Sequence, residues 1–292
     1  ASKGADTLLP QFQQQYQTVL QQLIKLRQTA MALEGLLGRD RGCQSTQAAA
    51  IAQLRLLATE TQAAQSISEA LWAHLDATTA DHPENFSEAL QNLLPDLSQR
   101  PEIEVDVLSH LVLACGDVSL AAFAKFSGDA IKAARESLQA GCTVVGDVPA
   151  VINTLDQTRL THLGCRWTTL INNPHVNDAA EAEHTFWEST DWSARLMPLI
   201  DGNIWVVGYA PSVLMQLCKS IAQHRYRPAL VIGLPIGFSH APAAKRQLVQ
   251  LDVPYITVEG TLGGGLLAAV VLNRLAASLI EKPDCHCYLQ GQ

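Results

Sequence analysis

The sequence predicts an α/β protein with a three-layer α/β/α domain around a mostly parallel five-stranded sheet, preceded by an N-terminal helical hairpin. Short, continuous apolar runs such as Ile204–Val207 and Tyr255–Val258 are typical of buried parallel strands. These runs alternate with helical patterns, which favours right-handed βαβ crossovers. Before residue 103, apolar residues recur instead at steps of three and four, which is the helical period.

The helical hairpin is predicted within residues 1–102. Its first helix spans residues 7–37, and a second helix begins near Ser45 or Thr46, either of which can cap it, and continues to Leu75. A polar connection with one short helix, residues 86–94, follows. The first helix carries an unbroken apolar seam, typical of coiled-coil-like packing: Leu9, Phe12, Tyr16, Val19, Leu23, Leu26, Ala30, Leu33 and Leu37.

The α/β domain is predicted over residues 103–282, with a tail at 283–292. Helices are expected at Val105–Ala114 and Gly128–Ala140, the second stopped by Gly141. The five strands are expected at Thr143–Asp147, Arg166–Ile171, Ile204–Val207, Ala229–Gly233 and Tyr255–Val258.

The composition bounds the function. A hydrophobic content of 48% over 292 residues supports a sizeable core, and a net charge of −8 offers no basic field for nucleic acid. No charge-free apolar run reaches membrane-spanning length, and the amino end lacks the pattern of a signal peptide. Seven cysteines, an odd number, argue against a full disulfide framework. We therefore expect a soluble, cytoplasmic protein without a membrane span.

Glycine-rich loops follow three of the predicted strands: Gly208–Pro211, Gly233–Phe238 and Gly260–Gly265. Ligands of open parallel sheets bind beyond the carboxyl ends of the strands, and glycine lets the backbone approach them closely. Singly, such glycines merely punctuate short connections, but three successive loops favour a binding rim. Neither phosphate-binding fingerprint occurs, although the helix opened by Gly263–Gly265 can receive an acidic group at its amino end.

No metal site is predicted. Cys285, His286 and Cys287 could ligate a soft metal, but a zinc site normally has a fourth ligand and wider spacing between its pairs, so this segment is interpreted as a disordered tail, with metal binding as the alternative.

Several short motifs occur in order and together resemble the precorrin-8X methylmutase family of the cobalamin pathway over about residues 103–280. They are Ala114–Val118, Phe126–Ser127 leading into Ala133–Gly141, Gly146–Asp147, Gly208–Pro211, Val231–Phe238 and Gly260–Gly264. The resemblance implies a homodimeric α/β protein that binds a corrin-type tetrapyrrole and shifts a methyl group to a neighbouring ring carbon. It implies no dissociable cofactor, although a tetrapyrrole can stay bound.

The sequence departs from the family's pattern at the positions that carry charge. The resemblance implies a histidine that acts as a general acid, but Leu113 occupies that position. It also implies an arginine that binds the acidic substrate, and counting back from Gly208 without gaps places Glu188 at that position. A small gap in the count would bring Arg195 to the arginine position instead, but that residue lies seven positions further on, in another predicted helix. The substrate-binding residues implied by the resemblance are Leu113, Cys115, Glu188, Tyr209, Ala210, Pro211, Pro235, Gly237, Phe238, Thr261, Gly263, Gly264 and Gly265.

Two histidines are candidates for the missing acid. His240 follows the rim loop directly, and His110 precedes Leu113 by one helical turn. The alternatives are a solvated loop residue for His240 and a histidine bonded to a backbone carbonyl at the core edge for His110. Tyr209 is either a pocket wall or a hydrogen-bond donor.

Two functions remain open on the sequence. One is a tetrapyrrole-binding or assembly module whose methyl-shifting activity is lost or altered, with the N-terminal helices as the docking surface for a protein partner. The other is an active methylmutase, an isomerase, that uses His240 or His110 as its acid.

Overall fold

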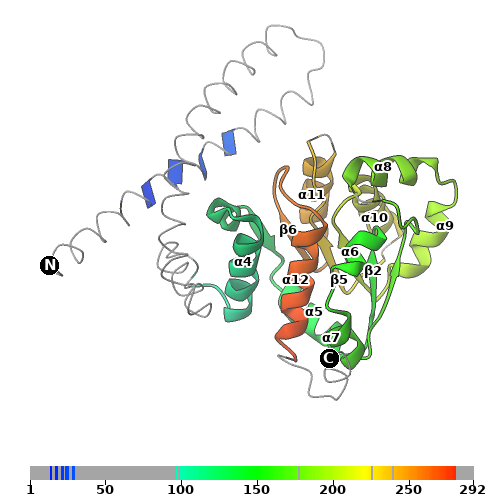
Figure 1. Ribbon diagram of the computed structural model, residues 1–292, viewed down its shortest axis with the longest axis horizontal. Coiled ribbons are helices and arrows are strands. Elements are labelled where there is room, and N and C mark those ends of the chain that lie inside the picture. The colour runs from blue at the N-terminus through cyan, green and yellow to red at the C-terminus, as the bar shows by residue number, and fades with distance from the viewer. Residues whose placement is uncertain are drawn as a thin grey trace, which may run out of the picture. The chain divides into compact units, whose positions relative to one another are not determined.

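Figure 1 shows a computed structural model of the chain. It describes residues 99–280 apart from Asn177, Arg225 and Ser239, together with Leu97 and scattered residues between Gln14 and Thr29. The chain divides into two compact units, residues 1–100 and 101–292.

In the first unit, the described residues between Gln14 and Thr29 are helical, as predicted for that stretch. The Thr18 hydroxyl donates to the Gln14 carbonyl and the Thr29 hydroxyl to the Lys25 carbonyl, both at 2.9 Å. The apolar seam, the turn and the second predicted helix lie outside the described residues.

The second unit alternates helices and strands. In chain order its elements are α4 (Glu102–Cys115), η2 (Val118–Ala122), β1 (Ala124–Phe126), α5 (Ala130–Gln139), β2 (Thr143–Gly146), α6 (Pro149–Asn153), α7 (Gln157–His162), β3 (Arg166–Thr169), α8 (Ala179–Glu188), α9 (Trp192–Leu196), η3 (Met197–Leu199), β4 (Ile204–Val207), α10 (Pro211–His224), β5 (Leu230–Gly233), α11 (Ala241–Val249), β6 (Tyr255–Val258) and α12 (Gly265–Ala277).

The sheet has six strands, in the order β1-β6-β5-β4-β2-β3, so the predicted count of five is wrong. The five predicted strands are all present and parallel to one another. The additional strand, β1, pairs antiparallel with β6. It was missed because three residues, Ala124–Phe126, between a 3₁₀ helix and a turn are shorter than any apolar run that periodicity can detect.

Several element ends also differ from the prediction. α4 starts at Glu102 rather than Val105, because Pro101 and two acidic residues in the first turn form a good helix start. β2 and β3 end at Gly146 and Thr169, two or fewer residues before their predicted ends. β4 and β5 are buried along their whole length, as their continuous apolar sequences require.

The helices pack in two groups. α4, α5, α6 and α7 all contact α12, whereas α8 and α11 contact α10. Both groups also contact the sheet, α12 at β4 and β5 and α10 at β4, which is the grouping that a three-layer arrangement requires. Figure 1 shows α12 lying along the sheet between α4 and the remaining helices.

The connections reverse direction between β2 and β4. From β2 the chain passes outward to β3 and then returns to β4 on the other side of β2, after which β5 and β6 follow in turn. The carboxyl ends of β2 and β4 therefore form the topological switch point, where open α/β sheets bind their ligands. Among the described helices, none is long and apolar enough to span a membrane.

Candidate functional site

Asp147, the residue directly after β2, bridges the switch point. One carboxylate oxygen, Oδ2, accepts hydrogen bonds from the backbone N–H groups of Gly208, Tyr209 and Ala210 at 3.1, 2.7 and 2.8 Å. The other, Oδ1, accepts from the Val148 N–H at 3.0 Å. The side chain is fully buried, and this burial raises its pKa from 3.8 to about 6, although the four N–H donors oppose the shift. Asp147 thus fixes the loop after β4 as the floor of the crevice.

The three glycine-rich loops are joined to each other by backbone hydrogen bonds. Gly264 N–H donates to the Leu234 carbonyl at 2.8 Å, Gly237 N–H to the Thr261 carbonyl at 3.2 Å, and Ile236 N–H to the Gly208 carbonyl at 3.3 Å. Each loop therefore bonds to at least one other. They form one continuous rim over the ends of β4, β5 and β6.

Two glycines make this contact between loops possible. A Cβ on Gly208 would lie 2.5 Å from the Gly265 Cα, and one on Gly263 would lie 2.2 Å from the Leu234 carbonyl oxygen. Real Cβ atoms do not approach other atoms so closely. Glycine at these positions is thus needed for one loop to pack on the next, and the sequence-level argument for glycine has a specific cause.

Lys245 on α11 supports the rim from below. Its ammonium donates to the Gly260 carbonyl at 3.0 Å and to the Leu262 carbonyl, both in the loop after β6. The side chain is buried, and burial lowers its pKa from 10.5 to about 7. Lys245 and Asp147 therefore hold two loops of the rim through single buried charges.

Apolar side chains project around the rim. Phe238 and Ile236 are exposed on the loop after β5, and Leu266 is exposed on the first turn of α12. Asp106 near the start of α4 pairs with Arg274 near the end of α12, so these two helices run antiparallel. The last turn of α4 is therefore at the same end of the helix pair as the first turn of α12. Leu113, on that last turn, is 50% exposed, and Leu266 is on the first turn of α12. Such an apolar border suits the face of a flat organic ring system.

The other half of the carboxyl edge, at the ends of β2 and β3, carries two cavities lined by both polar and apolar side chains. One of about 190 Å³ is lined by Asn172, Asn173, Phe186, Trp192 and Arg195, among others. A second, of about 360 Å³, opens beside β3 and shares Asn172 and Arg195 with the first. Arg195, on α9, lines both cavities, and a guanidinium can bind carboxylates in a bidentate manner.

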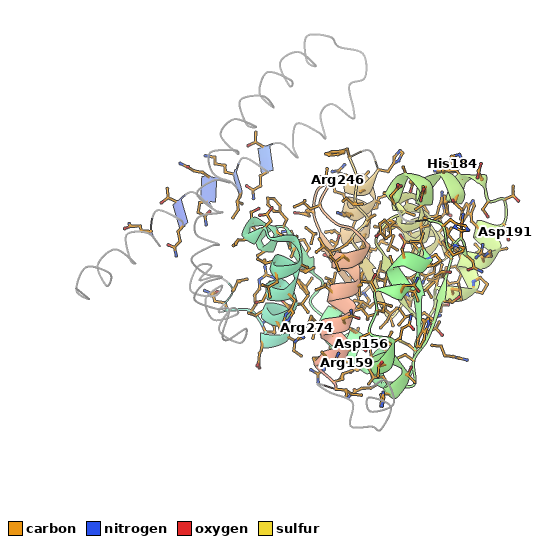
Figure 2. All side chains as sticks on the ribbon, viewed as in Figure 1. Asp156, Arg159, His184, Asp191, Arg246 and Arg274 are labelled. Carbon is orange, nitrogen blue, oxygen red and sulfur yellow. The ribbon has the colours of Figure 1, made fainter. Side chains whose placement is uncertain are left out.

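Asp191 is the acidic neighbour of Arg195 at the surface. A 2.7 Å hydrogen bond from the Ser189 hydroxyl and, more weakly, the charge of Arg195 lower the pKa of Asp191. Asp191 is exposed at the start of α9 (Figure 2), so water screens its attraction for the guanidinium.

With this geometry in view, the sequence profile of the family described as precorrin-8X methylmutase matches residues 85–278. The chain belongs to the precorrin-8X methylmutase family. The matched range covers the expected α/β domain up to residue 278 and extends into the polar connection before residue 103.

Individual relatives agree. The chain is 36% identical to the cobalt-precorrin-8 methylmutase of Synechocystis sp., in an alignment covering 64% of this chain and 75% of that protein. It is 32% identical to the precorrin-8X methylmutase of Sinorhizobium sp., covering 62% and 86%. The crystal structure of the precorrin-8X methylmutase from Thermus thermophilus superposes with a TM-score of 0.52 at 32% identity, covering 61% of this chain and 85% of that one.

The structure brings most of the predicted substrate-binding residues of the methylmutase-like domain together on the rim. Tyr209, Gly237, Phe238, Thr261, Gly263 and Gly264 are exposed or half-buried there. Ala210, Pro211, Pro235 and Gly265 are buried. Buried positions shape the backbone from behind rather than offer a side chain to a ligand. The Tyr209 ring packs over Gly265, where a Cβ would lie 2.4 Å from the ring.

Leu113 and Cys115 lie at the carboxyl end of α4, and both are exposed. The Cys115 thiol contacts the carbonyls of Val112 and Asp117 at 3.7 and 3.8 Å.

Glu188 is exposed on the last turn of α8. Its carboxylate is 3.3 Å from His184 Nδ1, one turn earlier on α8, and both side chains are about 70% exposed (72% and 69%). Figure 2 shows His184 on the outer surface of α8. Glu183 instead faces the switch point, where it accepts hydrogen bonds from the Ser212 N–H at 2.7 Å and the Ser212 hydroxyl at 2.5 Å.

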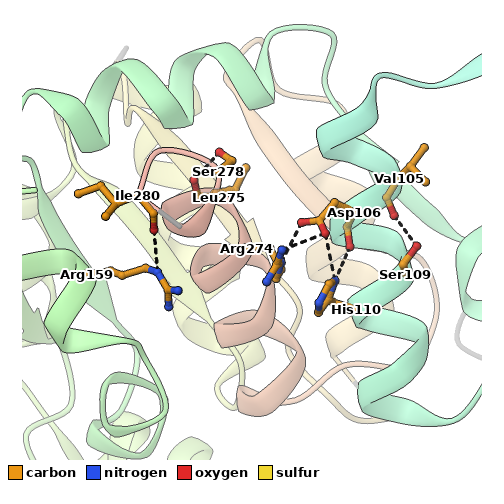
Figure 3. Close-up of polar contacts among 9 residues, drawn as sticks. All are labelled: Val105, Asp106, Ser109, His110, Arg159, Arg274, Leu275, Ser278 and Ile280. Atoms are coloured by element: carbon orange, nitrogen blue, oxygen red, sulfur yellow. Dashed lines mark hydrogen bonds and ion pairs between the residues drawn. The ribbon is translucent and has the colours of Figure 1, made fainter. Parts of the chain in front are cut away.

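The two histidine candidates differ sharply. His110 Nδ1 lies 2.8 Å from the Asp106 carbonyl oxygen and 3.4 Å from the Asp106 carboxylate, which is itself bound by Arg274 (Figure 3). Its ring is thereby directed along α4 toward Asp106 and away from the rim. His240 is exposed at the start of α11 and makes no capping hydrogen bond with its side chain.

Within the described part of the chain, no group of three or more His, Cys, Asp or Glu side chains is placed to hold a metal ion. Cys285, His286 and Cys287 lie outside it.

Proposed function

We propose that this chain binds a precorrin-type tetrapyrrole on the carboxyl edge of its sheet and catalyses migration of a methyl group between two carbons of the macrocycle. The reaction needs no dissociable cofactor, because the macrocycle itself supplies the migrating group and the conjugated system that accepts it. A homodimer is part of the same proposal.

The observation that carries the proposal is the rim at the topological switch point. Its loops are fixed by backbone hydrogen bonds and by Asp147, so its shape exists before a ligand arrives. Exposed apolar groups border it at Leu113, Phe238 and Leu266. A preformed site with apolar borders loses little conformational entropy when it binds a rigid ring system.

In this proposal His240 is the general acid. Protonation of the macrocycle withdraws electrons from the ring and so eases the methyl shift, and a positioned acid contributes about 10²- to 10⁴-fold. His240 follows the rim loop and its side chain is exposed, whereas the His110 ring is engaged with Asp106. Arg195 is the residue that receives a peripheral carboxylate of the ligand, since it lines both cavities beside the rim.

The second candidate function is binding without the methyl shift. It is favoured by Leu113, an exposed apolar side chain at the position where the family resemblance implies the acid. Leucine cannot donate a proton. A protein that carries or delivers the tetrapyrrole would retain the rim and dispense with the acid.

One experiment separates the two functions. The purified full chain is incubated with precorrin-8X, and visible absorption is followed as the methyl shift changes the chromophore, while binding is measured by gel filtration of the coloured ligand. Conversion supports the methylmutase, and binding without conversion supports the carrier. A chain that neither binds nor converts the ligand would contradict both.

Two matched variants identify the acid. We expect His240→Ala to slow conversion by about 10²-fold or more and to leave binding nearly unchanged. His110→Ala, a histidine on the same unit but held to Asp106, should retain activity. The opposite pattern would assign the acid to His110.

A further inference from the structure

Two cysteines directly precede neighbouring strands, and the chain around each has the same local structure. Cys142 follows Gly141 and precedes β2, and Cys165 follows Gly164 and precedes β3. Both glycines have left-handed backbones, with φ of 73° and 72°. Each glycine follows a helix and directs the chain into the next strand, so the two thiols occupy equivalent positions in two successive helix–strand units.

Strand pairing places these cysteines side by side. Thr143 is the register partner of Arg166, so the residues before them, Cys142 and Cys165, lie opposite each other. The ladder extends to this level, because Arg166 N–H donates to the Cys142 carbonyl at 3.1 Å. Paired strands lie about 4.8 Å apart, which falls within the range of about 4.4 to 6.8 Å that a disulfide spans between Cα atoms.

The turns before the cysteines are also in contact. A Cβ on Gly141 would lie 3.0 Å from the Gly164 carbonyl oxygen, so little relative movement is available to the two chain segments. Backbone packing therefore holds the two segments that carry the cysteines next to each other.

The surroundings distinguish the two thiols chemically. Cys142 is half-buried and accepts hydrogen bonds from the Cys165 thiol, the Ser137 hydroxyl and the Ile204 N–H. The bond from Cys165 contributes most, and together they lower the Cys142 pKa to about 7 against the opposing effect of burial. Cys165 is 5% exposed, its thiol also approaches the Leu138 carbonyl at 3.4 Å, and its pKa is raised, chiefly by its bond to Cys142. An accessible thiolate beside a protonated, buried thiol is the arrangement of a reactive cysteine and its resolving partner.

We propose that Cys142 and Cys165 form a reversible intrachain disulfide by exchange with a low-molecular-weight disulfide such as oxidised glutathione. The Cys142 thiolate attacks one sulfur of the small disulfide, forming a mixed disulfide and releasing one small thiolate. Cys165 then loses its proton and attacks the Cys142 sulfur, which releases the second small thiolate. Two protein thiols are oxidised, and one small disulfide is reduced to two thiols.

This pair lies at the amino ends of β2 and β3, the edge of the sheet opposite the rim. The inference is thus independent of the proposed tetrapyrrole chemistry. Its structural effect is a covalent link between two adjacent strands, which restricts the unfolded chain between residues 142 and 165 and so stabilises the oxidised domain.

The test uses the full chain, fully reduced and then equilibrated with oxidised glutathione, alkylated and digested for peptide mapping. We expect a peptide pair joined through Cys142 and Cys165, and its loss on treatment with dithiothreitol. Full alkylation of both cysteines, or Cys142 joined mainly to a different cysteine, would overturn the proposal.

Variants test the order of the two steps. Cys165→Ser should trap glutathione on Cys142, because no partner is left to resolve the mixed disulfide. Cys142→Ser should leave Cys165 unmodified, since its side chain is only 5% exposed. Cys218→Ser is the matched control, as this thiol is buried and its pKa is raised to about 12 by burial, and it should leave the linked pair unchanged. Glutathione on Cys165 in the Cys142→Ser variant would contradict the assigned roles.

Discussion

Along the carboxyl edge of the sheet, the ends of β4, β5 and β6 are tied to one another by backbone hydrogen bonds, whereas the ends of β2 and β3 open onto cavities lined by side chains. The first half owes its shape to glycine contacts and to two buried charges, Asp147 and Lys245. The second half presents Asn172 and Arg195, which are not buried.

This difference indicates a division of labour. Loops whose backbone groups bond to one another have a fixed geometry but distinguish poorly between ligands of different chemistry. The first half therefore determines where a ligand can lie. Exposed amide and guanidinium groups discriminate by charge and hydrogen bonding, so the second half sets which ligand is chosen. Changes in the first half should therefore lower stability, and changes in the second should lower affinity.

The largest effect is expected from Asp147→Ala. It leaves four buried N–H groups without their acceptor, and we expect the free energy of unfolding to fall by about 3–4 kcal/mol. Urea denaturation measures this, and hydrogen exchange should show lost protection at Gly208, Tyr209 and Ala210.

Asp178→Ala is the control for that substitution. Asp178 is an exposed N-cap of α8, accepting from Glu181 N–H at 2.9 Å, and its loss should cost about 1 kcal/mol. Equal losses in the two variants would remove the special status of Asp147.

The pH dependence of stability gives the next effect. Because burial raises the pKa of Asp147 to about 6, the folded state holds this proton more tightly than the unfolded state between about pH 4 and 6. Stability should therefore fall as pH rises through that window, by about 2–3 kcal/mol in total, and then level off. Asp147→Asn should remove this component. Identical slopes for the wild-type chain and the variant would contradict the raised pKa.

Gly263→Ala tests the contact between loops directly. Its Cβ would meet the Leu234 carbonyl oxygen at 2.2 Å, and the resulting overpacking should cost roughly 1–3 kcal/mol. Gly128→Ala is the matched change, since nothing lies within 4 Å of its Cβ position. That variant should be as stable as the wild-type chain or slightly more stable, by up to about 1 kcal/mol. A harmless Gly263→Ala would show that the loops can separate freely.

Much of the rigid half could be predicted from the sequence. Ile204–Val207 and its sister runs are long enough and apolar enough to identify buried strands, and the glycine loops follow from their position after those strands. The sixth strand could not be predicted, because Ala124–Phe126 is only three residues long and its pairing partner, β6, is more than a hundred residues away in the sequence.

The roles of the two buried charges cannot be read from the sequence for a different reason. Asp147 stands in a Gly-Asp pair, yet its role depends on N–H groups of the distant Gly208–Ala210 loop. Lys245 stands beside Arg246 in a predicted helix, where lysine is usually exposed, so nothing local in the sequence indicates that it is buried. Arg195 is in a different helix from Glu188, as the sequence predicts, but only the fold shows that α9 and the end of β3 line the same cavities. Conversely, Glu188 holds the aligned position but faces solvent beside His184.

Arg195→Ala tests the chemical half. Since Arg195 is partly exposed, stability should change by less than about 0.5 kcal/mol. Affinity for a carboxylated tetrapyrrole should fall about tenfold, the low end for a charge-assisted hydrogen bond. Arg166→Ala, at the opposite end of β3 and also exposed, should leave affinity unchanged. A comparable loss in both variants would indicate only a general effect of net charge.

The smallest effect is expected from Glu188→Gln. The carboxylate is 69% exposed and lies 3.3 Å from His184 Nδ1, so water and salt screen its repulsion of an acidic ligand. Removing the charge should change tetrapyrrole affinity by less than about twofold, and stability by less than about 0.5 kcal/mol. Titration of the coloured ligand at two salt concentrations measures this. A severalfold gain in affinity that disappears at high salt would contradict this prediction, because it would mean that Glu188 lies close to the bound ligand. The side chains that select the ligand would then lie on α8 and not on α9.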